Sequence, residues 1–435
     1  MLGSIGYYLS FLLDPLGFVG KRFAKYGDLY YAPAPDGGLY AVMHPDHLYE
    51  VLVSRAAQFD KTHTAFKRLG EVLGDGLLTS DGETWRRRRR MIQPAFSKER
   101  LAGYARGMVD EALRATSAMR DGEERDLDHD MMELTLRVVS RALFSHDAGG
   151  DTKVISEAMS AFQARLTGPA MVPGWIPDPG RRRVDRALAA LDQMVYGLIA
   201  ARKGKQVKSP SDLLDMLVTA IDTEGDGKGL TEREVRDELV TLFLAGHETT
   251  SNALAWTFHL LSTHREAERK LHEEIDALGG KPPSLADLER MPYGEMVLKE
   301  AMRMRPPVFM VARRAREATE IGGYPVPAGS EVVVWIYRTH HDPRWYPEPE
   351  RFRPERFAPA EESKLPKLAY APFGAGPRAC IGKSFAMIEA RLLLATLAQR
   401  FRFEPVSRAP VLQEPRITLG PKGGLRMRVK QRPPS

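Results

Sequence analysis

The stretch Phe373-Gly374-Ala375-Gly376-Pro377-Arg378-Ala379-Cys380-Ile381-Gly382 holds the only cysteine of the 435-residue chain. A strongly helical segment, Lys383 to Arg400, follows it, so Cys380 is predicted at or just before a helix N-terminus. Free backbone N–H groups and the positive end of the helix dipole stabilise a thiolate at such a place. The two glycines before the sulfur let the backbone fold tightly around it.

A single thiolate with no second Cys or His nearby does not suit zinc, but it is sufficient as an axial ligand to haem iron. Two alternatives stay open. Cys380 is a buried, inert side chain, or residues 374–379 form the GxGxxA fingerprint of a dinucleotide-dependent dehydrogenase. That fingerprint belongs after a strand, with an acidic residue about 20 positions later, but residues 395–400 contain none.

A long helix is predicted from Thr231 to His264, beginning with a capping box of Thr231 and Glu234. Its apolar centre, residues 242–250, contains a Gly, a carboxylate and two Thr. These residues are poorer helix formers than Ala or Leu, and a buried carboxylate is costly unless it is paired. The centre of the helix is therefore predicted to be functional. His247-Glu248 begins the zinc-protease motif HExxH, but Ser251 stands where the second His should be.

The composition excludes several classes of protein. The chain has 63 Lys and Arg against 57 Asp and Glu, and its hydrophobic share of 43% is typical of globular proteins. One Cys excludes a disulfide scaffold and favours a reducing compartment. The apolar segment Met1–Leu13 is too short to span a bilayer, and no Lys or Arg precedes it as in a signal peptide. We expect a soluble cytoplasmic protein with no membrane span and no nucleic-acid partner.

Helical patterns dominate the chain, which predicts a mainly α fold with small β-sheets (α+β). The helices are expected at Leu101–Arg120, Arg186–Lys203, Ser211–Ile221, Thr231–His264, Arg265–Leu278, Met296–Met304 and Ile381–Arg400. Strand patterns occur at Leu39–Met43, Glu331–Tyr337 and Leu425–Lys430. No linker is evident, so we expect one α-rich domain over residues 1–435, with sheets near 28–60, 308–340 and 405–432.

Six segments together resemble the cytochrome P-450 family of haem-thiolate monooxygenases, of the soluble bacterial type. Residues 373–382 resemble the haem-binding loop, and residues 245–250 resemble the oxygen-activating part of the central helix. Glu300-x-x-Arg303 and the later Arg356 resemble the family's structural network. Trp85, Arg89 and Arg313 resemble residues that meet the haem propionates. The resemblance covers residues 20–430.

The resemblance implies haem b (iron protoporphyrin IX) with Cys380 as the ligand of the metal. The cofactor-binding residues that it implies are Cys380, Trp85, Arg89, Arg313, Phe373, Gly374, Arg378, Gly382, Ala245 and Gly246. Gly246 would leave space for oxygen, while Thr249 and Glu248 would be catalytic and deliver protons. Peroxide-using relatives carry Arg-Pro at that pair, so the intact Glu-Thr pair favours O2 with an electron donor. A haem-thiolate sensor without turnover is a further alternative.

No flavin or iron–sulfur domain is visible, so the electrons are expected from a ferredoxin or flavodoxin and its reductase, with NAD(P)H used only indirectly. We expect a monomer whose docking face for the electron donor lies near Arg86–Arg90 and Lys383. The Arg residues of this run other than Arg89 are expected to be solvated or to face a partner. The substrate is expected to be apolar: a fatty acid, terpenoid, steroid or polyketide. The expected pocket residues are Phe66, Leu73, Leu77, Leu242, Val308, Val311, Thr418 and the stretch Phe162–Pro177.

Overall fold

Helices make up most of the structure and the strands are short, which confirms the predicted fold class. A computed structural model describes residues 10–11, 13–33, 38–62, 64–144, 154–155, 157–158, 161, 179–202 and 212–433. The helices are α2 (Pro15–Tyr26), α3 (Pro45–Tyr49), α4 (Thr64–Leu73), α5 (Gly82–Ile92), α6 (Lys98–Ser117), α7 (Leu127–Phe144), α9 (Pro179–Arg202), α10 (Leu213–Thr219), α11 (Glu232–Thr263), α12 (Arg265–Asp276), α13 (Pro292–Met304), α14 (Ile336–His340), α15 (Pro359–Glu362) and α16 (Lys383–Arg400).

The strands and short helical turns complete the set of elements. The strands are β1 (Leu29–Ala32), β2 (Leu39–Val42), β3 (Phe59–Asp60), β4 (Glu124–Asp126), β5 (Val311–Ala315), β6 (Thr319–Ile321), β7 (Tyr324–Val326), β8 (Glu331–Val334), β9 (Phe401–Pro405), β10 (Gln413–Pro415), β11 (Leu419–Pro421) and β12 (Arg426–Gln431). The turns used below are η1 (Glu50–Ser54), η5 (Pro354–Phe357) and η6 (Gly376–Arg378).

The chain divides into two compact units. The first consists of Met1–His63, Lys299–Cys380 and Leu412–Gly420, and the second consists of Thr64–Leu298, Ile381–Val411 and Pro421–Ser435. The expectation of one domain over the whole chain stays a prediction.

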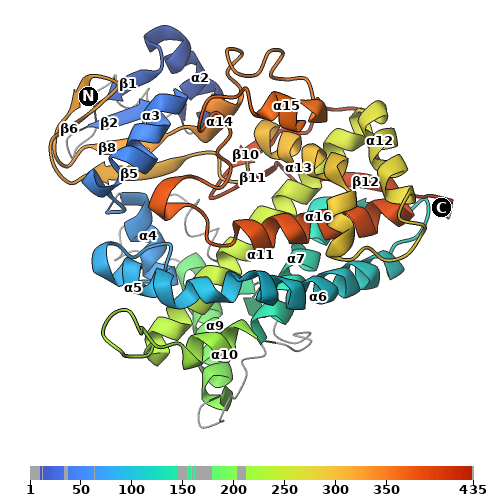
Figure 1. Cartoon of the computed structure of the whole chain (residues 1–435), viewed down its shortest axis with the longest axis horizontal. Coiled ribbons are helices and arrows are strands. Elements are labelled where there is room, and N and C mark those ends of the chain that lie inside the picture. The colour runs from blue at the N-terminus through green and yellow to red at the C-terminus, as the bar shows by residue number, and fades with distance from the viewer. Residues whose placement is uncertain are drawn as a thin grey trace. The chain divides into compact units, whose positions relative to one another are not determined.

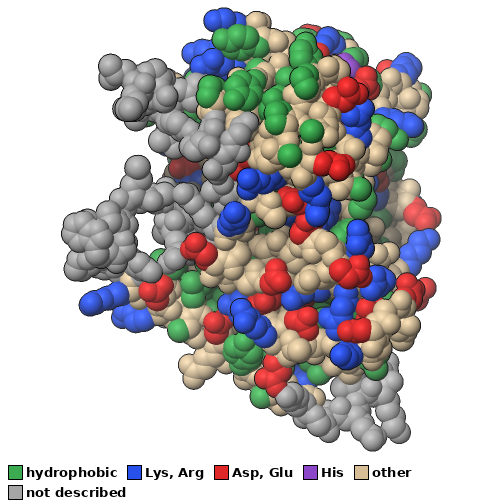
Figure 2. Space-filling view, turned by 90° about the vertical axis from the view of Figure 1, so that its left-hand side faces the viewer, with side chains coloured by type: hydrophobic (Ala, Val, Ile, Leu, Met, Phe, Trp, Pro, Cys, Tyr) green, Lys and Arg blue, Asp and Glu red, His purple; other side chains and the backbone are tan. Residues whose placement is uncertain are grey.

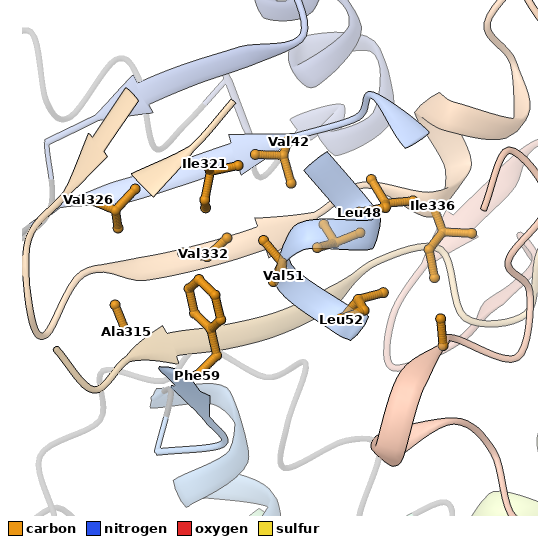
Figure 3. Packing of buried hydrophobic residues seen from close by; sticks show 12 residues of the cluster. Val42, Leu48, Val51, Leu52, Phe59, Ala315, Ile321, Val326, Val332 and Ile336 are labelled. Atoms are coloured by element: carbon orange, nitrogen blue, oxygen red, sulfur yellow. The ribbon is translucent and has the colours of Figure 1, made fainter. Parts of the chain in front are cut away.

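A five-stranded sheet in the order β1-β2-β8-β5-β3 forms the centre of the first unit. β2 and β8 pair in parallel, from Leu39 with Glu331 to Val42 with Val334. The continuous segment of α3 and η1 covers one face of this sheet (Figure 1). Its side chains Leu48, Val51 and Leu52 point toward the apolar residues of the strands (Figure 3). Burial of these side chains stabilises the unit.

The second unit is built around α11, which packs along α7 and also contacts α9 and α16. α16 lies beside α6 (Figure 1). A three-stranded sheet in the order β4-β12-β9 adjoins these helices, and its strand β12 confirms the predicted strand near the end of the chain. The capping box at Thr231 and Glu234 is present, with both of its hydrogen bonds formed.

Within the described part of the chain, no helix combines the length and the apolar character that crossing a bilayer needs. On the face shown in Figure 2, Lys and Arg side chains are interspersed with Asp and Glu. Among the described residues visible on that face, the positive charges therefore form no continuous stripe of the kind that follows a nucleic-acid backbone.

Candidate functional site

Cys380 ends a tight loop that presents its side chain to solvent. The Cys380 N–H donates to the carbonyl of Phe373 (N···O 2.9 Å), and Gly374 and Gly376 have φ of 66° and 67°. A Cβ on Gly376 would lie 1.8 Å from the carbonyl oxygen of Leu52, so only glycine fits there. Cys380 is exposed rather than buried, which argues against an inert core cysteine. α16 begins three residues later, as predicted.

The dinucleotide alternative lacks its structural context. Residues 343–382 are all described, and they contain turns, η5, α15 and η6 but no strand. The GxGxxA segment at 374–379 therefore does not follow a strand of a βαβ unit, which the dinucleotide fingerprint requires.

α5 carries Trp85 and Arg89 one turn apart. The Arg89 guanidinium carbon lies 5.7 Å from the centre of the Trp85 ring, which is a cation–π contact. Both side chains are partly exposed, so Arg89 keeps a polar surface that could bind a carboxylate.

Three other residues of the arginine run, Arg87, Arg88 and Arg90, differ from the expectation that they are solvated or face a partner, because each binds an acidic residue of this chain. Arg88 is buried, and its Nη1 donates to Glu238 Oε1 at 3.0 Å. Arg90 donates to both carboxylate oxygens of Asp222, and Arg87 donates to Glu234. Arg86 is the member with a largely exposed side chain, at 62%. Helical spacing predicts the face of α5 on which each arginine lies, but it does not predict the acidic partner in a distant segment.

The centre of α11 has one face that is open to solvent although the helix around it is buried. Ala245 is exposed, and Leu242, Gly246 and Thr249 are partly exposed. The residues beside them along the helix are buried, namely Phe243, Leu244, His247, Glu248 and Thr250. Positions 242, 245, 246 and 249 share one helix face, which we call the open stripe. An open face within a buried helix is a place where a bound group can sit.

Hydroxyl groups contact the backbone along this part of α11. Thr249 Oγ1 donates to the carbonyl of Ala245 (2.8 Å), and Thr135 Oγ1 of α7 donates to the carbonyl of His247 (3.0 Å). The His247 ring Nδ1 lies 2.6 Å from the carbonyl of Phe243. Burial lowers the pKa of His247, so the ring is neutral and donates its Nδ1–H to this carbonyl.

Gly246 lies where α11 faces α7. A Cβ built on Gly246 would lie 3.1 Å from Val139 Cγ2 of α7. The missing side chain therefore allows α7 and α11 to pack closely. The expected role of Gly246 in leaving space for oxygen stays a prediction.

Glu300, Arg303 and Arg356 come together in the first unit. Arg303 donates to Glu300 through Nε (2.7 Å) and Nη2 (2.9 Å), and both side chains are fully buried. Arg356 Nε lies 3.3 Å from Glu300 Oε1. The Arg303 guanidinium also donates to the carbonyls of His340 and Pro349. Charged groups buried this completely are tolerated because each has partners.

The other expected site residues fall into two groups, one in each unit. In the first unit Arg313 of β5 is buried, and Val308 and Val311 are partly buried. The Leu419 N–H donates to the carbonyl of Pro307, which joins the Thr418 segment to this strand. In the second unit Leu73 and Leu77 are buried and Phe66 and Leu242 are partly buried. The expected pocket stretch Phe162–Pro177 lies outside the described residues.

Glu389 of α16 is a buried acidic residue that was not predicted from the sequence. Its side chain is fully buried, and neither carboxylate oxygen has a hydrogen-bond partner among the described residues. Burial raises its pKa to about 8, and the nearby Thr250 hydroxyl offsets this only in part. The carboxyl group is therefore neutral at pH 7. The signal that could have identified it is that Glu389 is the one acidic residue of α16.

The donor set suits a haem bound through sulfur. Cys380 offers one accessible thiol at the end of a constrained loop, which is the ligand type of haem-thiolate proteins. Arg89, Arg313 and Arg378 are suited to carboxylates such as the haem propionates. The open stripe of α11 offers an accessible, mostly apolar helix face.

Comparisons with known proteins give the same assignment. A family model described as "Cytochrome P-450" matches residues 8–425. Cyclooctatin synthase of Streptomyces melanosporofaciens is 36% identical over 97% of this chain and 92% of its own. Cyclooctat-9-en-7-ol 5-monooxygenase of the same organism is 37% identical over 92% and 88%. Pentalenene oxygenase of Streptomyces avermitilis is 31% identical over 99% and 96%.

Proposed function

Because the chain belongs to the cytochrome P-450 family of monooxygenases, we propose that it hydroxylates a cyclic terpenoid, with Cys380 as the axial ligand of haem b iron. The observation that carries the site is the exposed thiol at the end of the constrained loop 373–380, in a chain that matches the family along almost its whole length. The thiolate-bound haem supplies the reductive activation of dioxygen.

The residues of this chain have three kinds of role in the proposal. Residues 373–382 hold the sulfur in place, since the Gly376 contact with Leu52 and the Cys380 N–H bond restrict the loop. Trp85, Arg89, Arg313 and Arg378 bind the carboxylates of the cofactor. Glu300, Arg303 and Arg356 form a structural network.

Protons are delivered by Thr249 and Glu248 in this proposal. Thr249 lies on the open stripe, and its hydroxyl is held by the Ala245 carbonyl, so its oxygen can accept a hydrogen bond from water or substrate. Glu248 is the adjacent buried carboxylate, which can exchange a proton with water that reaches the stripe.

A terpenoid is favoured over a fatty acid, steroid or polyketide by the names of the relatives. One relative is named as a monooxygenase of cyclooctat-9-en-7-ol, an unsaturated alcohol. Another is named as an oxygenase of pentalenene, an alkene. The candidate pocket residues Phe66, Leu77, Leu242, Val308 and Val311 are apolar, which suits substrates of this kind.

Electrons come from a separate ferredoxin or flavodoxin and its NAD(P)H-dependent reductase in this proposal. The net charge of +6 suits an acidic partner. Arg86 and Lys383 are the exposed cations of the expected docking region. We also propose a cytoplasmic location, because the single cysteine suits a reducing compartment.

A carbon monoxide difference spectrum of the reduced protein tests the proposal. The wild-type protein should give the red-shifted band of a thiolate-bound haem, and Cys380→Ala should lose it. Terpene hydrocarbons and alcohols are then titrated while the iron spin state is followed, and binders are incubated with a ferredoxin system for product analysis. A colourless wild-type protein, or an unchanged spectrum in Cys380→Ala, would contradict the assignment.

A further inference from the structure

Residues 72–77, at the end of α4 and just after it, lie against α11 through their backbone. Arg236 Nη1 donates to the carbonyl of Val72 (3.2 Å). The Asp75 N–H donates to Asp237 Oδ2 (3.0 Å), and the Leu77 N–H donates to Glu238 Oε2 (3.0 Å). Three consecutive side chains of α11, which we call the latch, thus bind three backbone groups of one short segment.

The latch is buried and connects further elements. Asp237 is 2% exposed and Glu238 is fully buried. The second oxygen of Glu238 accepts from Arg88 of α5, and Arg236 Nε donates to Asp192 of α9 (2.7 Å). Hydrogen bonds to charged groups are strong where water is excluded. The position of residues 72–77 is therefore fixed jointly with α5, α9 and α11.

Two glycines make this close approach possible. A Cβ on Gly74, which has φ of 70°, would lie 2.1 Å from Asp237 Oδ1. A Cβ on Gly76 would lie 2.3 Å from Thr241 Oγ1 and 2.9 Å from the backbone carbonyl oxygen of Asp237. The Asp237 carbonyl cannot rotate away as a side chain can. A residue larger than glycine at position 76 must therefore move the segment away from α11.

One residue of the latch, Glu238, stands in line with the open stripe of α11. Glu238 and Leu242 are four residues apart and share the helix face that continues through Ala245 to Thr249. Because Glu238 binds the backbone of Leu77, it places the buried Leu77 one turn before the first residue of the open stripe.

Resting on the proposed function, we infer that Arg236, Asp237 and Glu238 are positioning residues for the substrate: they hold the backbone of residues 72–77 on α11 and so determine where Leu77 stands beside the open stripe. They touch no reacting atom. Their effect reaches the substrate through the segment that they hold.

Gly76→Ala tests the inference, with Gly70→Ala as its matched control. Both change one glycine to alanine, six positions apart, but a Cβ on Gly70 of α4 meets nothing within 4 Å. Amide hydrogen exchange of residues 72–80 in the haem-loaded protein measures how firmly the hydrogen bonds of the latch keep this segment on α11. Binding of 4-phenylimidazole measures the apolar surroundings of the haem, while binding of imidazole senses mainly the iron.

In the Gly76→Ala variant, the amide hydrogens of Asp75 and Leu77 should exchange faster than in the wild type. The variant should also bind 4-phenylimidazole more weakly, by about ten-fold or more. Its imidazole affinity and carbon monoxide band should match those of the wild type. Gly70→Ala should match the wild type in every measurement. Unchanged exchange in Gly76→Ala, or faster exchange with unchanged 4-phenylimidazole affinity, would overturn the inference.

Asp237→Asn is the second variant, in case Gly76→Ala does not fold. It keeps the shape of the side chain and both glycines, but it removes the charge that faces Arg236 and the Asp75 amide. It should shift exchange and 4-phenylimidazole affinity in the same direction by a smaller factor, and a variant like the wild type in both would overturn the inference. A wild-type protein without the carbon monoxide band would count against the proposed function, whereas the exchange result tests the latch separately.

Discussion

Gly376 shows how one missing side chain shapes the loop before Cys380. Its α-carbon approaches the Leu52 carbonyl so closely that any Cβ would overlap it. The glycine itself was predicted to matter, because its spacing from the cysteine and from the following helix is a local feature of the sequence. Its partner Leu52 was not predictable, since no local pattern links segments so far apart in the chain.

Thr249→Ala should reduce the coupling of electron consumption to product by several-fold and raise the release of hydrogen peroxide. The physical reason is that the variant lacks the hydroxyl on the open stripe that orders proton delivery. NADPH consumption, product and peroxide are measured together with a bound substrate.

Thr257→Ala is the control for that experiment. Thr257 makes the same kind of hydrogen bond as Thr249, from its hydroxyl to the carbonyl four residues earlier, but it is fully buried two turns further along α11. Its coupling should equal that of the wild type. Equal coupling in Thr249→Ala and Thr257→Ala would remove the assigned role of Thr249.

Glu389 gives the stability of the protein a pH dependence. Burial raises its pKa from 4.5 to about 8. Between pH 4.5 and pH 8 the unfolded chain has released a proton that the folded protein keeps. The contribution of Glu389 to the free energy of unfolding is therefore fully present below pH 4.5. This contribution is lost as the pH rises toward 8, by at most about 1.4 kcal/mol per pH unit.

Glu389→Gln, which resembles the neutral acid, should therefore gain stability relative to the wild type between pH 5 and pH 8. Urea unfolding of both proteins at the two pH values measures this gain. If the two proteins differed in their free energy of unfolding by the same amount at pH 5 and at pH 8, Glu389 would not titrate in this range.

At the scale of elements, the best predicted helix is α11. Its capping box, its lack of proline and its apolar pattern all agree, and the observed helix begins and ends within one residue of the prediction. The predicted strand Glu331–Tyr337 was too long, since β8 ends at Val334 and the chain continues into α14. Its aromatic and β-branched residues favour a strand locally, but tertiary packing bends the chain.

The helix α7 was not predicted, although it is the main neighbour of α11. Its sequence is apolar on several faces, because it is buried on more than one side, and so it lacks the one-sided pattern of a surface helix. The latch was missed for a related reason. Sequence spacing identifies which residues share a helix face, but it does not identify the backbone that this face binds.

The buried ion pair within α13 should contribute far more to the stability of the protein than an exposed pair with the same spacing. Glu300→Gln leaves Arg303 and Arg356 buried without their carboxylate, which should destabilise the protein by about 3–5 kcal/mol. Glu361→Gln removes the exposed partner of Lys364, also three residues away, and should have little effect. Unfolding by urea compares the two variants, and equal losses of stability would contradict the structural role of Glu300.

At the scale of the whole molecule, charge governs the encounter with the electron donor. Arg86→Glu should slow the first reduction by a ferredoxin several-fold at low salt and flatten its dependence on ionic strength. Arg86 is the suitable position, because its ion pair with Glu83 is exposed, whereas Arg88 and Arg90 bind the buried carboxylates of Glu238 and Asp222.

Lys281→Glu is the control, since it changes the net charge equally at an exposed residue outside the arginine run. Stopped-flow reduction over a range of salt concentrations gives both rates. If the two charge reversals slowed reduction equally, the effect would come from net charge and not from a docking face near Arg86.

The parallel pairing of β2 with β8 also has a consequence for synthesis on the ribosome. Leu39 emerges about 290 residues before its partner Glu331. The hairpin of β1 and β2 therefore leaves the exit tunnel with one edge unpaired, and it must wait until most of the chain has been translated. An unpaired strand edge is prone to pair with other chains, so the interval before β8 is translated is a stage at which the nascent chain is exposed to aggregation.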